Sequence, residues 1–210
     1  PPGVLPEIEP GRGTPSLRDN PATLYGSWWH TLFQHFPWKT GVAQWETAFD
    51  AMQPSSPQPE RSAREWRKVH DGLANSKLAE FVRRSSTVVQ TESPFLWSVD
   101  DQRCLEGVID LLVIDQAGRE CWLVDWKTND IGRSDAEHLR MRYLPQLAAY
   151  WKVVTSITGF SVHAALFPTA LGELLLYKRD ELSTEWARLE KLPPHEIGAE
   201  VAPDAATPAF

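Results

Sequence analysis

Two apolar segments joined by a short polar one constrain the fold of this chain more than any other feature. They are residues 104–114 (CLEGVIDLLVI) and 120–128 (ECWLVDWKT), and DQAGR lies between them. Both segments are rich in β-branched and aromatic residues, and the spacer contains a glycine, so the pattern predicts a β-hairpin. With the turn centred on the spacer, Leu112 faces Leu123 and Asp110 faces Asp125.

This register places three ionisable groups, Asp110, Asp125 and Lys127, on one face at the end of the hairpin distant from the turn. Two carboxylates opposite one another, with Cβ atoms roughly 5 Å apart, repel, and apolar neighbours add a desolvation cost. A divalent cation would turn this liability into a binding site, because hard cations take carboxylate oxygens. Lys127 would then lie beside the metal, where an ammonium can stabilise charge developing on a phosphate.

The pattern therefore favours a metal site for phosphodiester hydrolysis. The alternative remains open at this point: Asp125 and Lys127 could form an ordinary ion pair at a strand end, and Asp110 could simply end a strand.

The rest of the chain alternates helical and strand-like patterns. Ser27 is expected to cap a helix whose apolar stripe is Trp29, Leu32, Phe33 and Phe36. Further helices are expected over 42–52, 60–83, 135–157 and 180–191, and further strands over 86–92, 95–99, 161–168 and 173–178. This order predicts a mixed α/β fold with one central β-sheet flanked by helices and an N-terminal helical segment.

The length of 210 residues suits one domain with tails. Residues 1–22 and 193–210 are rich in Pro, Gly and Ala without periodicity, so we expect them to be a linker or tail, with one domain over 23–192. Ends of this kind suit a module of a longer polypeptide. No apolar run is long enough to cross a membrane, and the N-terminus does not resemble a secretory signal.

Composition limits the classes of cofactor and partner. The two cysteines are too few for a disulfide framework or for the four thiolates of an iron–sulfur cluster, so we expect a cytoplasmic protein without such a cluster. The net charge of −7 is unusual for a general nucleic-acid binder, which is normally basic. DNA binding would therefore need local basic patches or a partner that delivers the strand.

Five motifs carry a family resemblance. In chain order they are GSWWHTLFQ (26–34), ESPF (92–95), GVIDLL (107–112), LVDWKT (123–128) and YLPQLAAY (143–150). Together they resemble the successive motifs of the PD-(D/E)XK nuclease superfamily, specifically the RecB/AddA-type exonuclease domain of bacterial helicase–nucleases. Ile109 stands where the superfamily name has Pro.

The resemblance implies a restriction-endonuclease-like core and a role for each matching residue. Asp110 and Asp125 would be metal ligands and catalytic acids, Lys127 the catalytic lysine, and His30 and the main-chain carbonyl of Trp126 further ligands. Gln146 and Tyr150 would lie near the site, contacting the DNA backbone or positioning the lysine, and Glu92 would lie close to the active centre. Taken alone, His30 or the row of Gln146 and Tyr150 would more often be structural.

The function implied is a Mg²⁺- or Mn²⁺-dependent DNA nuclease, and an imidazole ligand suits Mn²⁺ better. The resemblance points to an exonuclease in recombinational repair, acting on single strands supplied by a helicase domain in the same or an associated polypeptide. An alternative is a catalytically inactive nuclease fold that acts as a DNA-binding or interaction module.

Clustered basic residues are candidate phosphate contacts despite the acidic total. They are Arg61, Arg64, Lys68, Arg83, Arg84, Arg133, His138, Arg140 and Arg142, of which we favour the last two. Trp28 or Trp126 could stack on bases. The alternative is that these arginines lie on solvated helix faces and that the tryptophans belong to the core.

Overall fold

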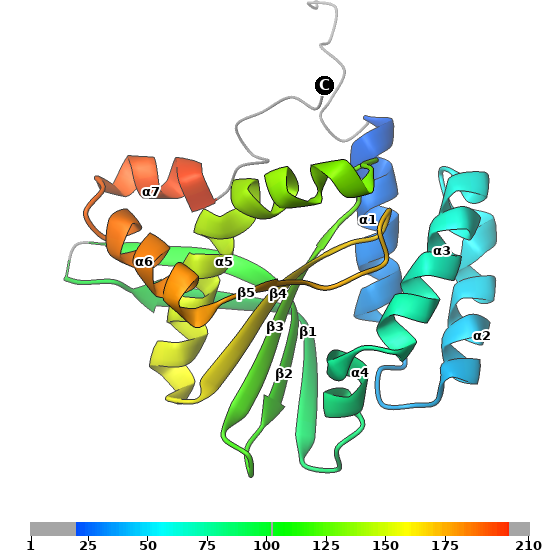
Figure 1. The fold of residues 1–210 in the computed structure, drawn as a ribbon, viewed down its shortest axis with the longest axis horizontal. Coiled ribbons are helices and arrows are strands. Elements are labelled where there is room, and N and C mark those ends of the chain that lie inside the picture. Colours follow the sequence, from blue (N-terminus) through cyan, green and yellow to red (C-terminus); the bar gives the residue numbers. More distant parts are fainter. Residues whose placement is uncertain (1–19, 102, 202–210) are drawn as a thin grey trace, which may run out of the picture.

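A five-stranded mixed sheet forms the centre of the computed structural model, which describes residues 20–101 and 103–201 (Figure 1). The strands are β1 (Thr87–Ser98), β2 (Cys104–Asp115), β3 (Glu120–Lys127), β4 (Ser161–Pro168) and β5 (Leu175–Tyr177), and they are adjacent in that order. Only the β3–β4 pair is parallel, and the crossover that a parallel pair requires contains a long helix, α5 (Ala136–Thr158). The expected mixed α/β fold with one central sheet is confirmed.

Helices cover both faces of this sheet (Figure 1). One face carries α1 (Pro21–Gln34), α2 (Val42–Met52), α3 (Pro59–Ala74) and α4 (Lys77–Val82). The other carries α5, α6 (Arg179–Leu189) and α7 (Pro194–Val201). Two short 3₁₀ turns, η2 (Gln53–Ser55) and η3 (Arg133–Asp135), complete the described elements.

The two faces have separate apolar cores, because side chains alternate along each strand. Leu111 and Val124 pack with the aromatic side chains of α1–α4, whereas Leu112 and Leu123 pack against α5. Burial on both faces explains why β3 reads as a nearly continuous apolar segment.

The register of the hairpin matches the prediction. Leu112 pairs with Leu123, and the β2–β3 ladder ends at the pair Leu111–Val124. The next position on each strand is an aspartate, so Asp110 and Asp125 lie directly beyond the last paired residues.

A bend in the long β1–β2 ribbon coincides with these acids. Ile109 packs in the core on the α5 face while Leu111 packs in the opposite core, so the alternation of β2 is broken at Asp110. Across from it, pairing in β1 skips Glu92, which has a φ of 48°. Beyond the bend, residues 93–98 and 104–109 form an arm that continues past α5 and α6.

The arm is held by aromatic contacts with these two helices. The ring centroids of Phe95 and Tyr150 are 5.2 Å apart, and those of Trp97 and Trp186 are 5.9 Å apart. Residues 86–92 and 95–99, expected as two strands, therefore form one continuous strand that turns from the main sheet into the arm.

Three helix boundaries differ from the expectation. Helix α1 begins at Pro21 with Asn20 as its cap, not at Ser27. The helix expected over 60–83 is two helices, because the Ser76 side chain accepts a hydrogen bond from the Ala79 N–H and starts α4. In the segment expected as a C-terminal tail, α7 forms and buries Ile197 and Val201.

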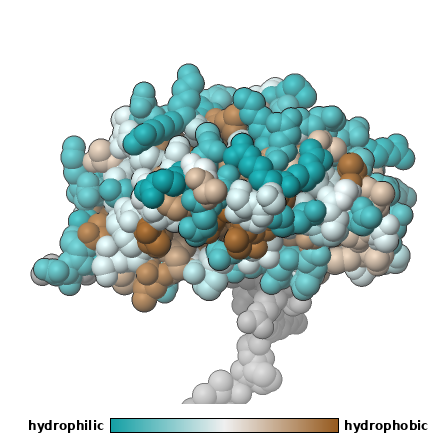
Figure 2. Space-filling model, turned by 90° about the horizontal axis from the view of Figure 1, so that it is seen from below, coloured by the Kyte–Doolittle hydropathy of each residue, from teal (hydrophilic) through white to brown (hydrophobic). Residues whose placement is uncertain are grey.

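Among the residues that the structure describes, no helix combines the length and the apolarity needed to cross a membrane. Figure 2 shows one face on which hydrophilic residues predominate and hydrophobic ones lie in separate places among them. No broad apolar surface is visible on that face.

Candidate active site and metal centre

The acid pair lies where β2 and β3 separate. Asp110 and Asp125 are both buried, with 8 % and 3 % of their surface exposed. The Trp126 N–H donates a 2.7 Å hydrogen bond to Asp110 Oδ2. This backbone N–H, which would otherwise continue the β2–β3 ladder, is therefore bound by a side chain. In an extended strand the N–H and C=O of one residue point to the same edge, so the Trp126 carbonyl faces this side as well.

Lys127 lies on the same face as Asp125, as the sequence predicted. Its Nζ is 2.8 Å from Asp125 Oδ2 and 4.2 Å from the centre of the Tyr143 ring. Burial acts to lower the pKa of Lys127, but attraction by Asp125, Tyr143 and Asp110 outweighs it, and the pKa is raised. Lys127 is therefore a cation in this site.

His30 and Glu92 complete the group from the other side. His30 Nδ1 is 3.2 Å from Glu92 Oε1 and 3.5 Å from Asp110 Oδ1. Ligand atoms of His30, Glu92 and Asp110 all lie within 4.8 Å of one another. The side chains of His30 and Glu92 are 34 % and 27 % exposed, so the group is open to solvent.

The electrostatics of this group favour an additional positive charge. Burial and the charge of Asp125 raise the pKa of Asp110. Burial opposes protonation of His30, yet the hydrogen bond to Glu92 and the charge of Asp110 raise the pKa of His30 overall. Both shifts have the direction expected where carboxylates lie close together in a partly buried site.

The donor set fits a divalent cation. Carboxylates of Glu92 and Asp110 and the imidazole of His30 are grouped as ligands for Mg²⁺ or Mn²⁺ require. Asp125 is not a member of this close group, and its Oδ2 lies 2.8 Å from Lys127 Nζ. Glu92 is thus itself a member of the candidate ligand group, which lies at the bend in the β1–β2 ribbon.

Gln146 and Tyr150 lie next to one another on α5. Gln146 Nε2 donates to the Tyr150 hydroxyl over 3.3 Å, and Gln146 Oε1 is buried without a hydrogen-bond partner among the described residues. The Tyr150 ring packs in the core on Phe95. A Cβ on Gly107 would lie 2.9 Å from the Tyr150 hydroxyl, so this close approach requires glycine. Burial, with a contribution from the charges of Asp125 and Asp110, raises the pKa of Tyr150.

The two favoured DNA contacts, Arg140 and Arg142, both lie on α5. Arg140 forms ion pairs with Glu137 at 2.9 Å and with Glu181 at 2.7 Å. The second of these ion pairs joins α5 to α6. Arg142 is exposed, and it lies four residues before Gln146 on the same helix.

Four other expected nucleic-acid contacts take part in the fold instead. Arg61 donates to the Thr128 carbonyl and Lys68 to the Ala170 carbonyl. Trp126 is 1 % exposed and stacks between Phe33 and Trp38, at centroid distances of 4.4 and 5.6 Å. The expectation that Trp126 stacks on bases is therefore wrong, and Trp28, 7 % exposed, is also a core residue.

The sequence interpretation missed a group of buried polar residues behind the site. Glu65 of α3 accepts hydrogen bonds from Tyr25, Arg61 and Thr169. The spacing of four residues between Arg61 and Glu65 was a signal for an ion pair, but nothing in the sequence indicated its distant partners.

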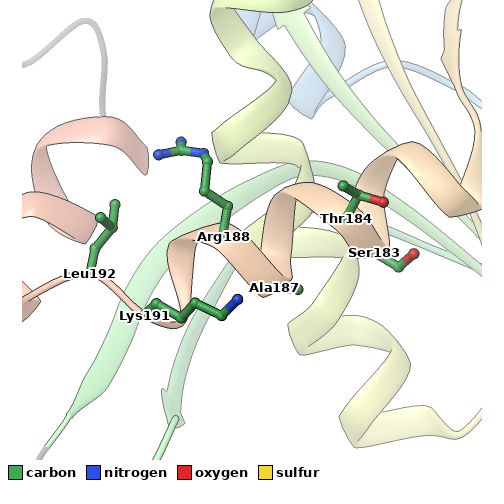
Figure 3. A pocket seen from close by; sticks show the side chains of 6 residues that line it. All are labelled: Ser183, Thr184, Ala187, Arg188, Lys191 and Leu192. Atoms are coloured by element: carbon green, nitrogen blue, oxygen red, sulfur yellow. The ribbon is translucent and has the colours of Figure 1, made fainter.

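The surface hollow in Figure 3 is unrelated to this site. It is shallow and is lined by residues of α6 and the following turn, with Arg188 at its edge. Arg188 is already ion-paired with Glu185 and Glu200. A second hollow, between residues 34–40 and the edge strand β1, likewise contains none of the clustered acids.

Comparison with known protein families matches residues 8–206 to the PD-(D/E)XK nuclease superfamily. No curated protein matches the chain. The family match covers nearly the whole sequence and includes every element that supplies the acids, Lys127 and His30. The chain therefore belongs to the PD-(D/E)XK nuclease superfamily.

Proposed function

We propose that this protein is a divalent-metal-dependent DNA nuclease that hydrolyses phosphodiester bonds. The observation that carries the proposal is the convergence of His30, Glu92 and Asp110 beside the Asp125–Lys127 pair. Family membership supports the same reaction class.

The side chains would have two roles, cation binding and stabilisation of negative charge on the phosphate. His30, Glu92, Asp110 and Asp125, with the carbonyl of Trp126, would hold the cation. A divalent cation supplies Lewis-acid polarisation of the phosphate and acidifies water. Lys127 Nζ, 2.8 Å from Asp125 Oδ2, would serve as a hydrogen-bond donor that stabilises negative charge on the phosphate. Gln146, with an unpaired buried oxygen, is placed to orient a polar group entering from the α5 side.

We further propose that the protein is of the RecB/AddA exonuclease type and degrades a single strand supplied by a helicase domain in recombinational repair. The order of the five motifs along the chain supports this. The acidic total charge also suits a nuclease to which a partner delivers the strand, since phosphate attraction alone would be weak. Either Mg²⁺ or Mn²⁺ fits the oxygen ligands, and His30 favours Mn²⁺.

Cleavage of end-labelled single-stranded DNA in the presence of Mn²⁺ tests the reaction. The wild-type protein is expected to degrade the strand, and Asp110→Asn, which keeps the shape of the side chain but removes its charge, is expected to be inactive. Metal-dependent binding without cleavage by either protein would instead support the inactive DNA-binding module. Equal cleavage by both proteins would contradict the assignment of the site.

A further inference from the structure

Helix α3 lies behind the site and reaches the end of β3 through a buried polar group. Glu65 is 5 % exposed although it is charged. A buried carboxylate is costly unless it is fully hydrogen-bonded, and three donors reach this one. Arg61 Nε lies 2.6 Å away, Thr169 Oγ1 2.6 Å and the Tyr25 hydroxyl 3.0 Å.

Two of these three donors also hold the backbone around Lys127. The Thr169 N–H donates a 2.8 Å hydrogen bond to the Lys127 carbonyl. Arg61 Nη2 donates a 2.8 Å hydrogen bond to the carbonyl of the next residue, Thr128. Glu65 therefore joins the two groups that fix the chain where β3 ends.

The third donor, Tyr25, connects this polar group to α1, the helix that carries His30. The Arg61 guanidinium stacks on the Tyr25 ring, with Cζ 4.3 Å from its centroid. Tyr25 lies five residues before His30 on this helix. The next residue, Gly26, lies close to Thr128, because a Cβ added at Gly26 would be 3.2 Å from Thr128 Oγ1. The same polar group thus contacts the elements on both sides of the site.

We propose that Glu65, Arg61 and Thr169 form a buried clamp that positions Lys127. The three are positioning residues: they act on the backbone of residues 127 and 128. A lysine side chain has four rotatable bonds, so a small backbone shift at Lys127 moves Nζ away from Asp125 and from the phosphate. Misplacement by about 1 Å can reduce turnover by roughly 10²-fold. The proposal rests on the catalytic role given to Lys127 above.

Glu65→Gln and Thr169→Val test the clamp with nearly unchanged shapes. The first removes the charge that Arg61 pairs with, and the second removes the hydroxyl donated to Glu65 while keeping the backbone N–H. Lys68→Met is the matched control, because Lys68 lies on the same helix and donates to the Ala170 carbonyl in the same loop, but its hydrogen bond involves none of the three clamp side chains. Thr169→Ser, which retains the hydroxyl, is expected to behave as wild type.

The first measurement is independent of nuclease activity. Competitive labelling with acetic anhydride, quantified for each lysine by mass spectrometry, reports how firmly Lys127 Nζ is held by Asp125. Labelling of Lys127 is expected to accelerate in Glu65→Gln and Thr169→Val and to stay unchanged in Lys68→Met. Unchanged labelling in both clamp variants, or an equal rise in Lys68→Met, would overturn the proposal. If Glu65→Gln fails to fold, Thr169→Val alone decides.

The second measurement is turnover. Both clamp variants are expected to lose about tenfold or more in kcat with KM unchanged. When either is combined with Lys127→Met, no further loss of kcat is expected, because the effects of residues that act through one group are not additive. A wild-type protein that does not cleave DNA would refute the proposed function, whereas the labelling result would still decide the clamp. Cleavage and labelling that are both insensitive to the clamp variants would refute the clamp and leave the function standing.

Discussion

The Lys127 ammonium lies between the Asp125 carboxylate and the Tyr143 ring, with 12 % of its side chain exposed. Replacing Lys127 with methionine preserves the aliphatic length but removes the charge. We expect Lys127→Met to lower kcat by about 10²–10³-fold, the usual cost of one lost donor at a developing anion. Mn²⁺ affinity, measured by calorimetry, is expected to stay equal or to increase, because a neighbouring positive charge has been removed. Full turnover in the variant would exclude Lys127 from catalysis.

Glu92 has a left-handed backbone at a position where the sheet provides no partner. This conformation costs a residue with a Cβ roughly 1–2 kcal/mol and costs glycine little. Comparing Glu92→Gly with Glu92→Ala isolates the contribution of the backbone conformation to the free energy of unfolding, because both variants lose the carboxylate. We expect the glycine variant to be the more stable by about 1 kcal/mol in urea denaturation, the reverse of the usual order in strands.

Both Glu92 variants are also expected to bind Mn²⁺ more weakly than wild type, because a ligand is lost from the group with His30 and Asp110. Backbone strain of this kind is typical of functional positions. If alanine proved more stable than glycine at position 92, the strain would not be present in solution.

At the scale of elements, α3 is fixed to the β4–β5 loop by a close backbone approach. A Cβ on Gly72 would lie 1.6 Å from the Gly172 carbonyl oxygen, and backbone cannot move aside as a flexible side chain can. Gly72→Ala is therefore expected to destabilise the protein by about 2 kcal/mol or more, as overpacked sites do. Because α3 also carries Glu65, the shift should reach the end of β3.

Gly198→Ala in α7 is the matched control for this change. It too replaces a helical glycine, but the new Cβ meets nothing within 4 Å. It is expected to stabilise the protein by about 0.5–1 kcal/mol through helix propensity. Urea denaturation of both variants gives the comparison, and a Gly72→Ala midpoint equal to wild type would show that α3 does not pack as described.

The elements that sequence patterns predicted well are those governed by local periodicity. The hairpin register followed from apolar alternation and turn position, and the boundaries of α2 were predicted residue for residue. The bend at Asp110 and Glu92 was not predictable from local pattern, because the arm beyond it contacts α5 and α6, which lie far away in the sequence. The clamp on Lys127 was hidden for the same reason: Glu65 and Thr169 are 104 positions apart and meet only in the folded chain.

Across the whole molecule, the net charge of −7 means that any DNA path must be locally basic. Ion pairs remove several candidate cations from that path. Arg140 is held by Glu137 and Glu181, and Arg188 by Glu185 and Glu200. Arg142 is the exposed member of a row on α5 that continues through Gln146 to Tyr150 beside the acids.

Salt dependence of DNA binding can test whether the strand follows this row. Each phosphate contact to a single strand contributes about 0.7 to the slope of log K against log salt, so Arg142→Ala is expected to flatten the slope by roughly that amount and to weaken binding at low salt. Arg188→Ala is the control and is expected to leave the slope unchanged, because this exposed arginine of α6 is already ion-paired with Glu185 and Glu200. Fluorescence anisotropy with a labelled oligonucleotide, in Ca²⁺ to prevent cleavage, measures both. Equal slopes for wild type and Arg142→Ala would place the strand elsewhere, since a lost phosphate contact must release fewer counterions.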